Sequence, residues 1–209
     1  MTKVKICGIT NLNDAILSAE LGADALGFNF YGDSPRFICL VLAKDITRRL
    51  PKSVMKVGVF VNETIEKIIE TVSIAGLDAV QLHGDESPKF IADLKLQTDC
   101  DLIKAFRVSE SFVPEEICDY DADAILLDAF SPDRHGGTGE TFDWEVARRV
   151  SDLTNKLYLA GGLSELNVRQ AITAVDPFAV DACSRLESTP GIKDGEKIRR
   201  FMMEAKCND

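Results

Sequence analysis

Short apolar segments recur along this chain at intervals of about 25 residues, with polar segments between them. Several of these segments are almost continuously hydrophobic, which is typical of strands that are covered on both faces. We therefore predict eight buried β-strands. They span residues 4–9, 25–30, 56–61, 79–82, 102–106, 124–128, 157–160 and 178–183.

Segments with apolar residues at helical spacing separate the predicted strands. Thr64 stands at an expected N-cap, and Ser87 stands at another, followed by Pro88 at the first helical position. Gly76 suits a left-handed helix end. The fifth unit is the weakest, because residues 115–120 allow one or two helical turns at most. The other helices are predicted at residues 14–21, 40–50, 65–74, 90–96, 143–153, 166–174 and 195–205.

Eight alternations of strand and helix imply right-handed βαβ units and a parallel sheet. Eight such units close into a (β/α)8 TIM barrel, so we predict a compact α/β barrel with a reduced fifth helix. The chain contains no linker or low-complexity run, which predicts a single domain over residues 1–209. A doubly wound open sheet is the alternative fold. Its dinucleotide-binding form is disfavoured, because no Gly-x-Gly-x-x-Gly motif follows the first strand.

The composition is that of an ordinary globular protein with an excess of acidic residues. Of 209 residues, 45% are hydrophobic and 28% are charged, and the net charge is −10. Phosphate backbones require a basic surface, so we expect no nucleic-acid partner. The apolar runs fall short of the roughly 18 residues of a membrane span, so we expect no membrane partner. The first strand begins almost at Met1 and leaves no room for a signal peptide, which predicts a cytoplasmic location.

Cysteine and histidine residues are too scattered to suggest a metal site. The six cysteines form no Cys-x-x-Cys pair, and the two histidines are His83 and His135. A structural zinc site and a disulfide framework are therefore both disfavoured. We expect no bound metal.

In a barrel of this kind, reactive groups lie where strands end and the following loops begin. Cys7 and Asp128 lie at the ends of the first and sixth predicted strands, and His83 follows the fourth. Each has an ordinary alternative: a buried packing cysteine, a capping aspartate, or a core histidine with satisfied hydrogen bonds. Polar residues and glycines gather at these strand ends while the strand interiors are apolar. This clustering favours a functional site at that rim.

The loops after the seventh and eighth strands have the composition of a phosphate site. Gly161 and Gly162 allow backbone N–H groups to approach a ligand closely. Asp181 and Ser184 lie at the end of the neighbouring strand. In this fold the pair of loops commonly binds phosphate, although a tight turn would also use glycine. We therefore expect a small phosphorylated molecule as the substrate.

A glycine-rich run, His-Gly-Gly-Thr-Gly, occupies residues 135–139. Its composition is that of a flexible loop, and functional loops in this fold often have it. We predict that Gly137 and Thr138 contact the substrate from a flap over the site.

Several motifs follow one another over the whole chain. They are Lys-Ile-Cys-Gly-Ile-Thr at 5–10, Gly-Phe-x-Phe at 27–30 with Ser-Pro-Arg at 34–36, Val-Gly-Val-Phe-Val-Asn at 57–62, Gln-Leu-His-Gly at 81–84, Leu-Asp at 127–128, Gly-Gly-Thr-Gly at 136–139 with Phe-Asp-Trp at 142–144, Leu-Ala-Gly-Gly-Leu at 159–163, and Pro-Gly-x-Lys-Asp at 190–194. Together they resemble the phosphoribosylanthranilate isomerase family of the tryptophan pathway. One departure is Arg185, which stands where the family usually has glycine in a Ser-Ser-Gly-Val-Glu-like run. Arg185 either adds a phosphate contact or points to solvent.

The resemblance implies an Amadori rearrangement of N-(5-phospho-β-D-ribosyl)anthranilate to 1-(2-carboxyphenylamino)-1-deoxyribulose 5-phosphate, without a cofactor. It also implies that Cys7 is the general base and Asp128 the general acid. Arg36 is the candidate to bind the anthranilate carboxylate through two hydrogen bonds, and a solvated surface arginine is the alternative. His83 is a further candidate substrate contact. We expect the assembly to be a monomer or a homodimer.

Other functions remain open at this level. A pentose-phosphate epimerase would be expected to have paired acids with metal-binding histidines. The isomerase of the histidine pathway would be expected to use aspartates at both catalytic positions, whereas this chain has Cys7 at one of them. A catalytically silent barrel that binds an anionic metabolite is a different class, and the acid–base pair at the strand ends argues against it.

Overall fold

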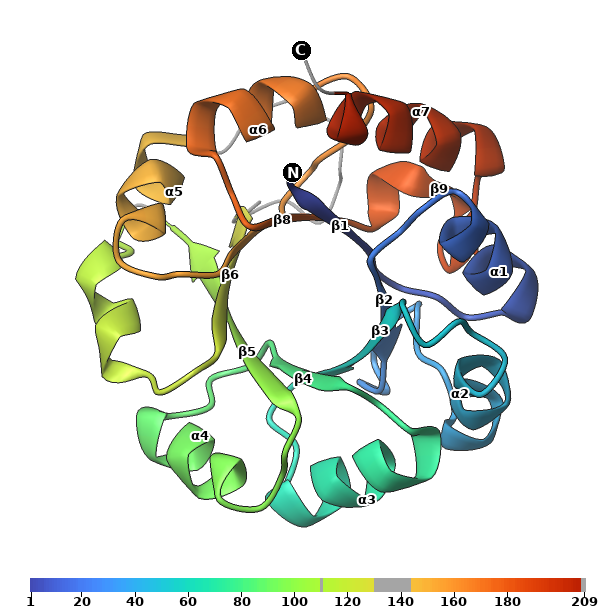
Figure 1. The fold of residues 1–209 in the computed structure, drawn as a ribbon. Coiled ribbons are helices and arrows are strands. Elements are labelled where there is room, and N and C mark those ends of the chain that lie inside the picture. The colour runs from blue at the N-terminus through green and yellow to red at the C-terminus, as the bar shows by residue number, and fades with distance from the viewer. Residues whose placement is uncertain (110, 130–143, 208–209) are drawn as a thin grey trace.

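Eight parallel strands close into a barrel in which each strand pairs with its neighbours in the chain and β1 pairs with β8 (Figure 1). The computed structural model describes residues 1–109, 111–129 and 144–207. The strands are β1 Lys3–Ile6, β2 Ala25–Asn29, β3 Met55–Phe60, β4 Ala79–Leu82, β5 Asp101–Val108, β6 Ala124–Ala129, β7 Leu157–Leu159 and β8 Ala179–Ala182. The predicted TIM barrel is therefore confirmed, and the open sheet is excluded.

Helices form a ring around the outside of the barrel (Figure 1). They are α1 Leu12–Glu20, α2 Leu40–Thr47, α3 Ile65–Ala75, α4 Pro88–Lys95, α5 Trp144–Ser151, α6 Val168–Val175 and α7 Gly195–Lys206. The fifth unit has only a 3-10 helix, Pro114–Asp119, as predicted. After β8 the chain forms a second short 3-10 helix, Ser184–Leu186, and the hairpin strands β9 Glu187–Thr189 and β10 Ile192–Lys193. No helix within the described ranges is long and apolar enough to cross a membrane.

Local hydrogen bonds explain where several helices begin and end. The Thr64 hydroxyl accepts from the backbone of Lys67, and the Ser87 hydroxyl accepts from Phe90 at the predicted caps. Gly76 ends α3 with a φ of 62°, also as predicted. The prediction for α2 was too long, because the helix ends at Thr47 and turns follow it.

The first strand is shorter than the apolar pattern suggested. It ends at Ile6, so Cys7 is the first residue beyond it and not part of its interior. The Cys7 N–H still donates to the Ala182 carbonyl at 2.9 Å, which keeps Cys7 against the end of β8. Gly8 then adopts a φ of 75°, a conformation that favours glycine, and the chain turns towards α1.

Successive residues on each strand belong to two different cores. One set, including Leu26, Val80 and Leu127, packs in the large cluster beneath the helices. The alternate set forms a smaller cluster that we place inside the barrel from the strand alternation. That cluster is Ala25, Val57, Ala79, Ile103, Ala105, Ala124, Leu126, Tyr158, Ala160 and Ala179. Inward positions nearer the carboxyl ends of the strands are polar, and they form the site described below.

Cys7 fits beside the second strand because Gly27 has no side chain. The strand register pairs Ile6 with Leu26, which brings Cys7 next to Gly27. A Cβ atom built on Gly27 would lie 2.7 Å from the Cys7 sulfur and 3.1 Å from its Cα. Both distances are shorter than a van der Waals contact, so a side chain at position 27 would displace Cys7.

We predict that Gly27→Ala lowers the free energy of unfolding by about 1–3 kcal/mol, because the added methyl group overlaps the Cys7 backbone. Gly32→Ala is the matched control, since nothing lies within 4 Å of a Cβ atom built there. Urea unfolding of both variants measures the difference. Equal midpoints for the two variants would contradict this account of Gly27.

Candidate active site

A cavity of about 250 Å³ opens at the carboxyl ends of the strands. It brings together every predicted site residue that the structure describes: Cys7, Arg36, His83, Asp128, Gly161, Gly162, Asp181 and Ser184. The predicted flap residues Gly137 and Thr138 lie outside the described residues. The cavity is therefore located where this fold places chemistry.

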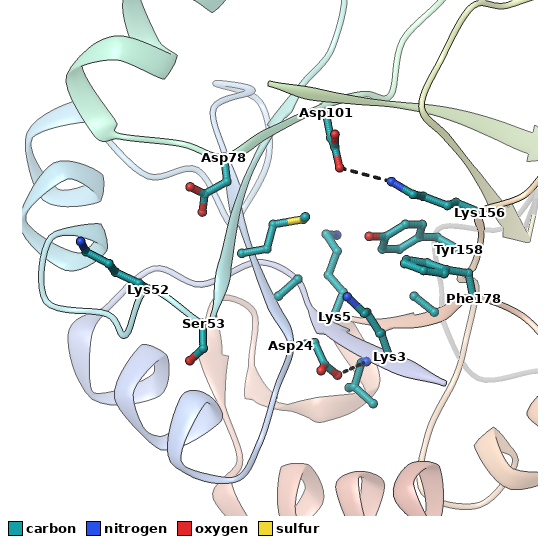
Figure 2. A pocket seen from close by; sticks show the side chains of 14 residues that line it. Lys3, Lys5, Asp24, Lys52, Ser53, Asp78, Asp101, Lys156, Tyr158 and Phe178 are labelled. Carbon is teal, nitrogen blue, oxygen red and sulfur yellow. Dashed lines mark hydrogen bonds and ion pairs between the residues drawn. The ribbon is translucent and has the colours of Figure 1, made fainter. Parts of the chain in front are cut away.

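A larger cavity, of about 530 Å³, lies at the opposite end of the barrel (Figure 2). Its lining mixes lysines with carboxylates, and each carboxylate is paired. The pairs are Asp24 with Lys206 at 2.6 Å, Asp78 with Lys56 at 2.8 Å, and Asp101 with Lys156 at 3.5 Å. Residues at this end of a barrel usually contribute to stability. We therefore place the chemistry in the smaller cavity.

Cys7 lies among groups that favour its ionised form. The Cys183 thiol donates a hydrogen bond to it, and the positive charges of Lys5 and Lys193 act in the same direction. Against the opposing effect of burial, they hold the pKa of the Cys7 thiol well below its usual value. The same hydrogen bond, together with burial, raises the pKa of Cys183. The two thiols therefore differ, and Cys7 is the one whose surroundings favour ionisation.

Asp181 is a buried carboxyl with one free oxygen. Its Oδ2 lies 3.0 Å from Nζ of Lys5, whose side chain is fully buried. Its Oδ1 has no hydrogen-bond partner among the described residues. Burial raises the pKa of Asp181 to about 6, although the charge of Lys5 acts in the other direction. Asp181 also lines the cavity, while this unpartnered oxygen is itself buried.

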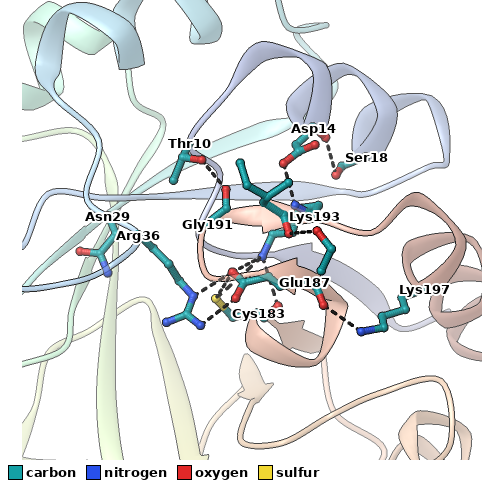
Figure 3. Close-up of polar contacts among 12 residues, drawn as sticks. Thr10, Asp14, Ser18, Asn29, Arg36, Cys183, Glu187, Gly191, Lys193 and Lys197 are labelled. Carbon is teal, nitrogen blue, oxygen red and sulfur yellow. Dashed lines mark hydrogen bonds and ion pairs between the residues drawn. The ribbon is translucent and has the colours of Figure 1, made fainter.

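Glu187 joins two cations at the edge of the cavity (Figure 3). Its oxygens accept from Nε and Nη2 of Arg36 at 2.8 and 2.7 Å, and Oε1 also accepts from Nζ of Lys193 at 3.1 Å. Burial opposes ionisation, but Arg36 and Lys193 hold the pKa of Glu187 below its usual value. One edge of the Arg36 guanidinium is therefore occupied, and a ligand carboxylate would use the edge formed by Nη1 and Nη2.

His83 and Asp128 lie next to each other on the cavity wall. Nε2 of His83 is 3.3 Å from Oδ2 of Asp128, and the Asp128 side chain is 34% exposed. On its other side, Nδ1 of His83 is 2.9 Å from Nε2 of Gln81. The histidine therefore contacts the candidate acid, an arrangement that neither alternative for His83 anticipated.

The remaining wall has the properties of an anion site. Gly161 and Gly162 have φ angles of 88° and 67°, which a residue with a Cβ rarely adopts. Ser184 and Arg185 line the cavity beside them, and both are exposed. Arg185 forms no ion pair with any described residue. Its charge is therefore available to a bound phosphate.

Five residues of the site were not anticipated as functional from the sequence: Lys5, Gln81, Cys183, Glu187 and Lys193. Three of them had a detectable signal, because Lys5, Gln81 and Cys183 each lie two positions from a predicted site residue. Alternation along a strand places such pairs on the same face. Glu187 and Lys193 had no such signal, since they belong to the hairpin after β8.

Across the part of the chain that the structure describes, no group of three or more His, Cys, Asp and Glu side chains is arranged to hold a metal ion. The groups that are present can exchange protons and bind anions. They are a low-pKa thiol, a carboxyl beside a histidine, and several cations.

Comparisons with known proteins match nearly the whole length of this chain. The family model described as N-(5'phosphoribosyl)anthranilate (PRA) isomerase matches residues 4–204. A relative from Citrifermentans bemidjiense, named N-(5'-phosphoribosyl)anthranilate isomerase, is 48% identical over 99% of this chain and 98% of its own. A crystal structure of phosphoribosyl anthranilate isomerase from Thermotoga maritima is 45% identical, with a TM-score of 0.91 over 99% of both chains.

Another similar structure is that of phosphoribosyl anthranilate isomerase in complex with reduced 1-(o-carboxyphenylamino)-1-deoxyribulose 5-phosphate. It is 42% identical and has a TM-score of 0.87 over 99% of both chains. The resemblance of the sequence motifs is thereby confirmed. The chain belongs to the phosphoribosylanthranilate isomerase family, the isomerases of tryptophan biosynthesis.

Proposed function

We propose that Cys7 and Asp128 are the general base and the general acid of the isomerisation. The observation that carries the proposal is the presence of both groups in one cavity: a thiol whose pKa is lowered well below its usual value, and a partly exposed carboxyl. A base must be ionised and an acid must hold a proton at the same time. The surroundings of Cys7 support the role of base, and the role of Asp128 as acid is proposed from its position in the same cavity.

The first step belongs to Asp128. Its proton passes to the ribose ring oxygen, the bond between C1 and that oxygen breaks, and the anthranilate nitrogen supplies the electron pair that forms the iminium. The electron pair of the acid O–H bond stays on Asp128 as a carboxylate. His83 lies beside Oδ2, where this charge develops.

The second step belongs to Cys7. Its thiolate takes the proton from C2, and the electrons of that C–H bond move to the iminium and form an enolamine. The enolamine then tautomerises to the ketone product. Lys5 and Lys193 favour the thiolate form of Cys7 before the transfer.

Two anionic ends of the substrate fix its orientation in our proposal. The phosphate lies against Gly161, Gly162, Ser184 and Arg185, and the anthranilate carboxylate lies against the free edge of Arg36. Asp181, which lines the same cavity, accepts a sugar hydroxyl through its carboxylate. The bound molecule of one related structure carries the same two anionic groups, a phosphate and a carboxylate, which supports this placement.

Other expectations from the sequence remain predictions. They are the substrate contacts of Gly137 and Thr138, a single domain over residues 1–209, a cytoplasmic location, and a monomeric or homodimeric assembly. One related protein, from Thermotoga maritima, is described as dimeric, with monomers generated from it.

Replacing either proton-transfer group should abolish most of the turnover. We predict that Cys7→Ala and Asp128→Asn each lower kcat at least about 100-fold, because each removes one positioned proton transfer. Cys39→Ala serves as the control, since this cysteine is exposed. Fluorescence of the anthranilate substrate follows the reaction, and circular dichroism checks the fold. Near-normal turnover in either variant would remove that residue from its role.

The Arg36 proposal predicts an effect on substrate binding. Arg36→Ala should raise KM about 10-fold or more with a smaller change in kcat, because a charge-assisted hydrogen-bonded pair is lost. Arg48→Ala is the control, since Arg48 is exposed and pairs only with a neighbouring surface aspartate. Steady-state kinetics separate the two constants. An unaltered KM for Arg36→Ala would exclude the carboxylate role.

The Cys183 hydrogen bond predicts a shift in the pH profile. Because the donor stabilises the thiolate, its loss in Cys183→Ala should raise the pKa of Cys7. The rise of kcat/KM with pH should then move upward, so that activity falls at neutral pH and recovers at alkaline pH. Cys183→Ser keeps a donor and should stay close to the parent profile. Superimposable profiles for Cys183→Ala and the parent would show that Cys183 does not tune the base.

A further inference from the structure

Gln81 is a buried amide that the mechanism above does not use. It lies on β4, two positions before His83, so both side chains point to the inside of the barrel. Gln81 is 1% exposed, and its Nε2 lies 2.9 Å from Nδ1 of His83. Its Oε1 has no partner among the described residues. Within the described part of the chain, the hydrogen bond of this amide is therefore to the histidine.

That contact decides which histidine nitrogen carries the proton. The NH2 group of an amide can only donate, so Nδ1 of His83 must accept. In the neutral imidazole the proton is then on Nε2, the nitrogen that lies 3.3 Å from Oδ2 of Asp128. If the amide were reversed, Nδ1 would hold the proton, and Nε2 would face Asp128 with a lone pair.

We propose that Gln81 is a positioning residue for the isomerisation: it holds His83 in the tautomer that directs its Nε2 proton at Asp128. This inference rests on the proposed role of Asp128 as the acid. Asp128 acts on the substrate through Oδ1, while Oδ2 faces the histidine.

The benefit arises during proton transfer. As the acid O–H bond breaks, its electron pair becomes negative charge shared by both oxygens of Asp128. A fixed N–H at Oδ2 stabilises that charge more strongly than it stabilises the protonated acid. The hydrogen bond from His83 therefore stabilises the transition state of proton transfer more than the bound substrate, which lowers the activation barrier of that step. Burial of Gln81 keeps water from competing for Nδ1.

The tautomer can be observed directly by correlating imidazole protons with their nitrogens in NMR spectra. The chain has two histidines, so His83→Gln identifies the signals of His83 by their loss. Asp128→Ala removes the carboxylate and leaves Gln81 as the remaining side-chain partner of the ring. In Asp128→Ala, we expect the His83 proton to remain on Nε2. In the double variant Asp128→Ala/Gln81→Glu, we expect the proton on Nδ1, because the new carboxylate accepts a hydrogen bond from Nδ1. An unprotonated Nδ1 in both variants would overturn the proposal.

Kinetics test the consequence for catalysis. Gln81→Met removes the donor at similar volume, and we expect kcat to fall about threefold to tenfold, as for the loss of one neutral hydrogen bond, while KM stays within about twofold. Gln97→Met is the matched control, since Gln97 is exposed just after α4 and its side chain donates to the Asp93 carbonyl of that helix. An unchanged kcat in Gln81→Met would overturn the proposal.

A double-mutant comparison separates positioning from packing. His83→Gln replaces the imidazole with an amide. An amide has no equivalent pair of tautomers for Gln81 to select between. If Gln81 acts through the imidazole, Gln81→Met causes no further loss in the His83→Gln background, because coupled residues are not additive. The same fold loss in both backgrounds would assign Gln81 to packing and overturn the inference.

Failure of the underlying acid assignment has a different signature. Normal kcat in Asp128→Asn would reject Asp128 as the acid, and with it the catalytic role of Gln81. A large loss in Asp128→Asn together with parental kcat in Gln81→Met would reject the Gln81 inference alone. The measurements on Asp128→Asn and Gln81→Met therefore distinguish the two failures.

Discussion

A buried ion pair joins the first strand to the last and connects the closure of the barrel with its chemistry. Lys5 and Asp181 are register partners across β1 and β8, with 3.0 Å between their charged atoms. Removing two charges from water is costly, and apolar side chains would often close such a seam more stably. Burial lowers the pKa of Lys5, but Asp181 and then Cys7 raise it above its usual value. The lysine therefore stays charged, two positions from the thiol that its charge activates.

Cations held by carboxylates also line or adjoin the rest of the cavity. The chain carries a net charge of −10, yet its substrate is anionic, so attraction has to be local. Lys5, Arg36 and Lys193 each face a carboxylate, and Glu187 serves two of them. These pairs fix the positions of the cations without removing their influence on Cys7 and on a ligand. Arg185 has no such partner among the described residues, so its charge is available to the phosphate in the proposed binding mode.

Much of the fold could be predicted because a barrel imposes strict periodicities. Strands and helices alternate, and the carboxyl ends of all strands lie at one rim of the barrel. The sequence alone therefore sufficed to place Cys7 and Asp128 in one site, and both line the same cavity. Family membership then decided against the epimerase, the histidine-pathway isomerase and the silent barrel. The strand end at Ile6 was missed, because Ile9 continues the apolar pattern while Gly8 turns the chain. The pairing of Arg36 with Glu187 joins side chains 151 positions apart, and no local pattern reports it.

The loop after β8 carries Arg185 at a position where the motif resemblance predicts glycine. Cys183 lies next to Cys7, the proposed base, and Arg185 lines the cavity at the proposed phosphate site, with Ser184 between them in the chain. A side chain at position 185 makes the close backbone approach of a glycine unnecessary, because a guanidinium can span the distance and bring charge. A thiol at position 183 keeps the donor that the Cys7 thiolate needs. In the proposed mechanism, the side chains at positions 183 and 185 supply a hydrogen-bond donor and a positive charge, and the reaction is retained with this variant of the motif.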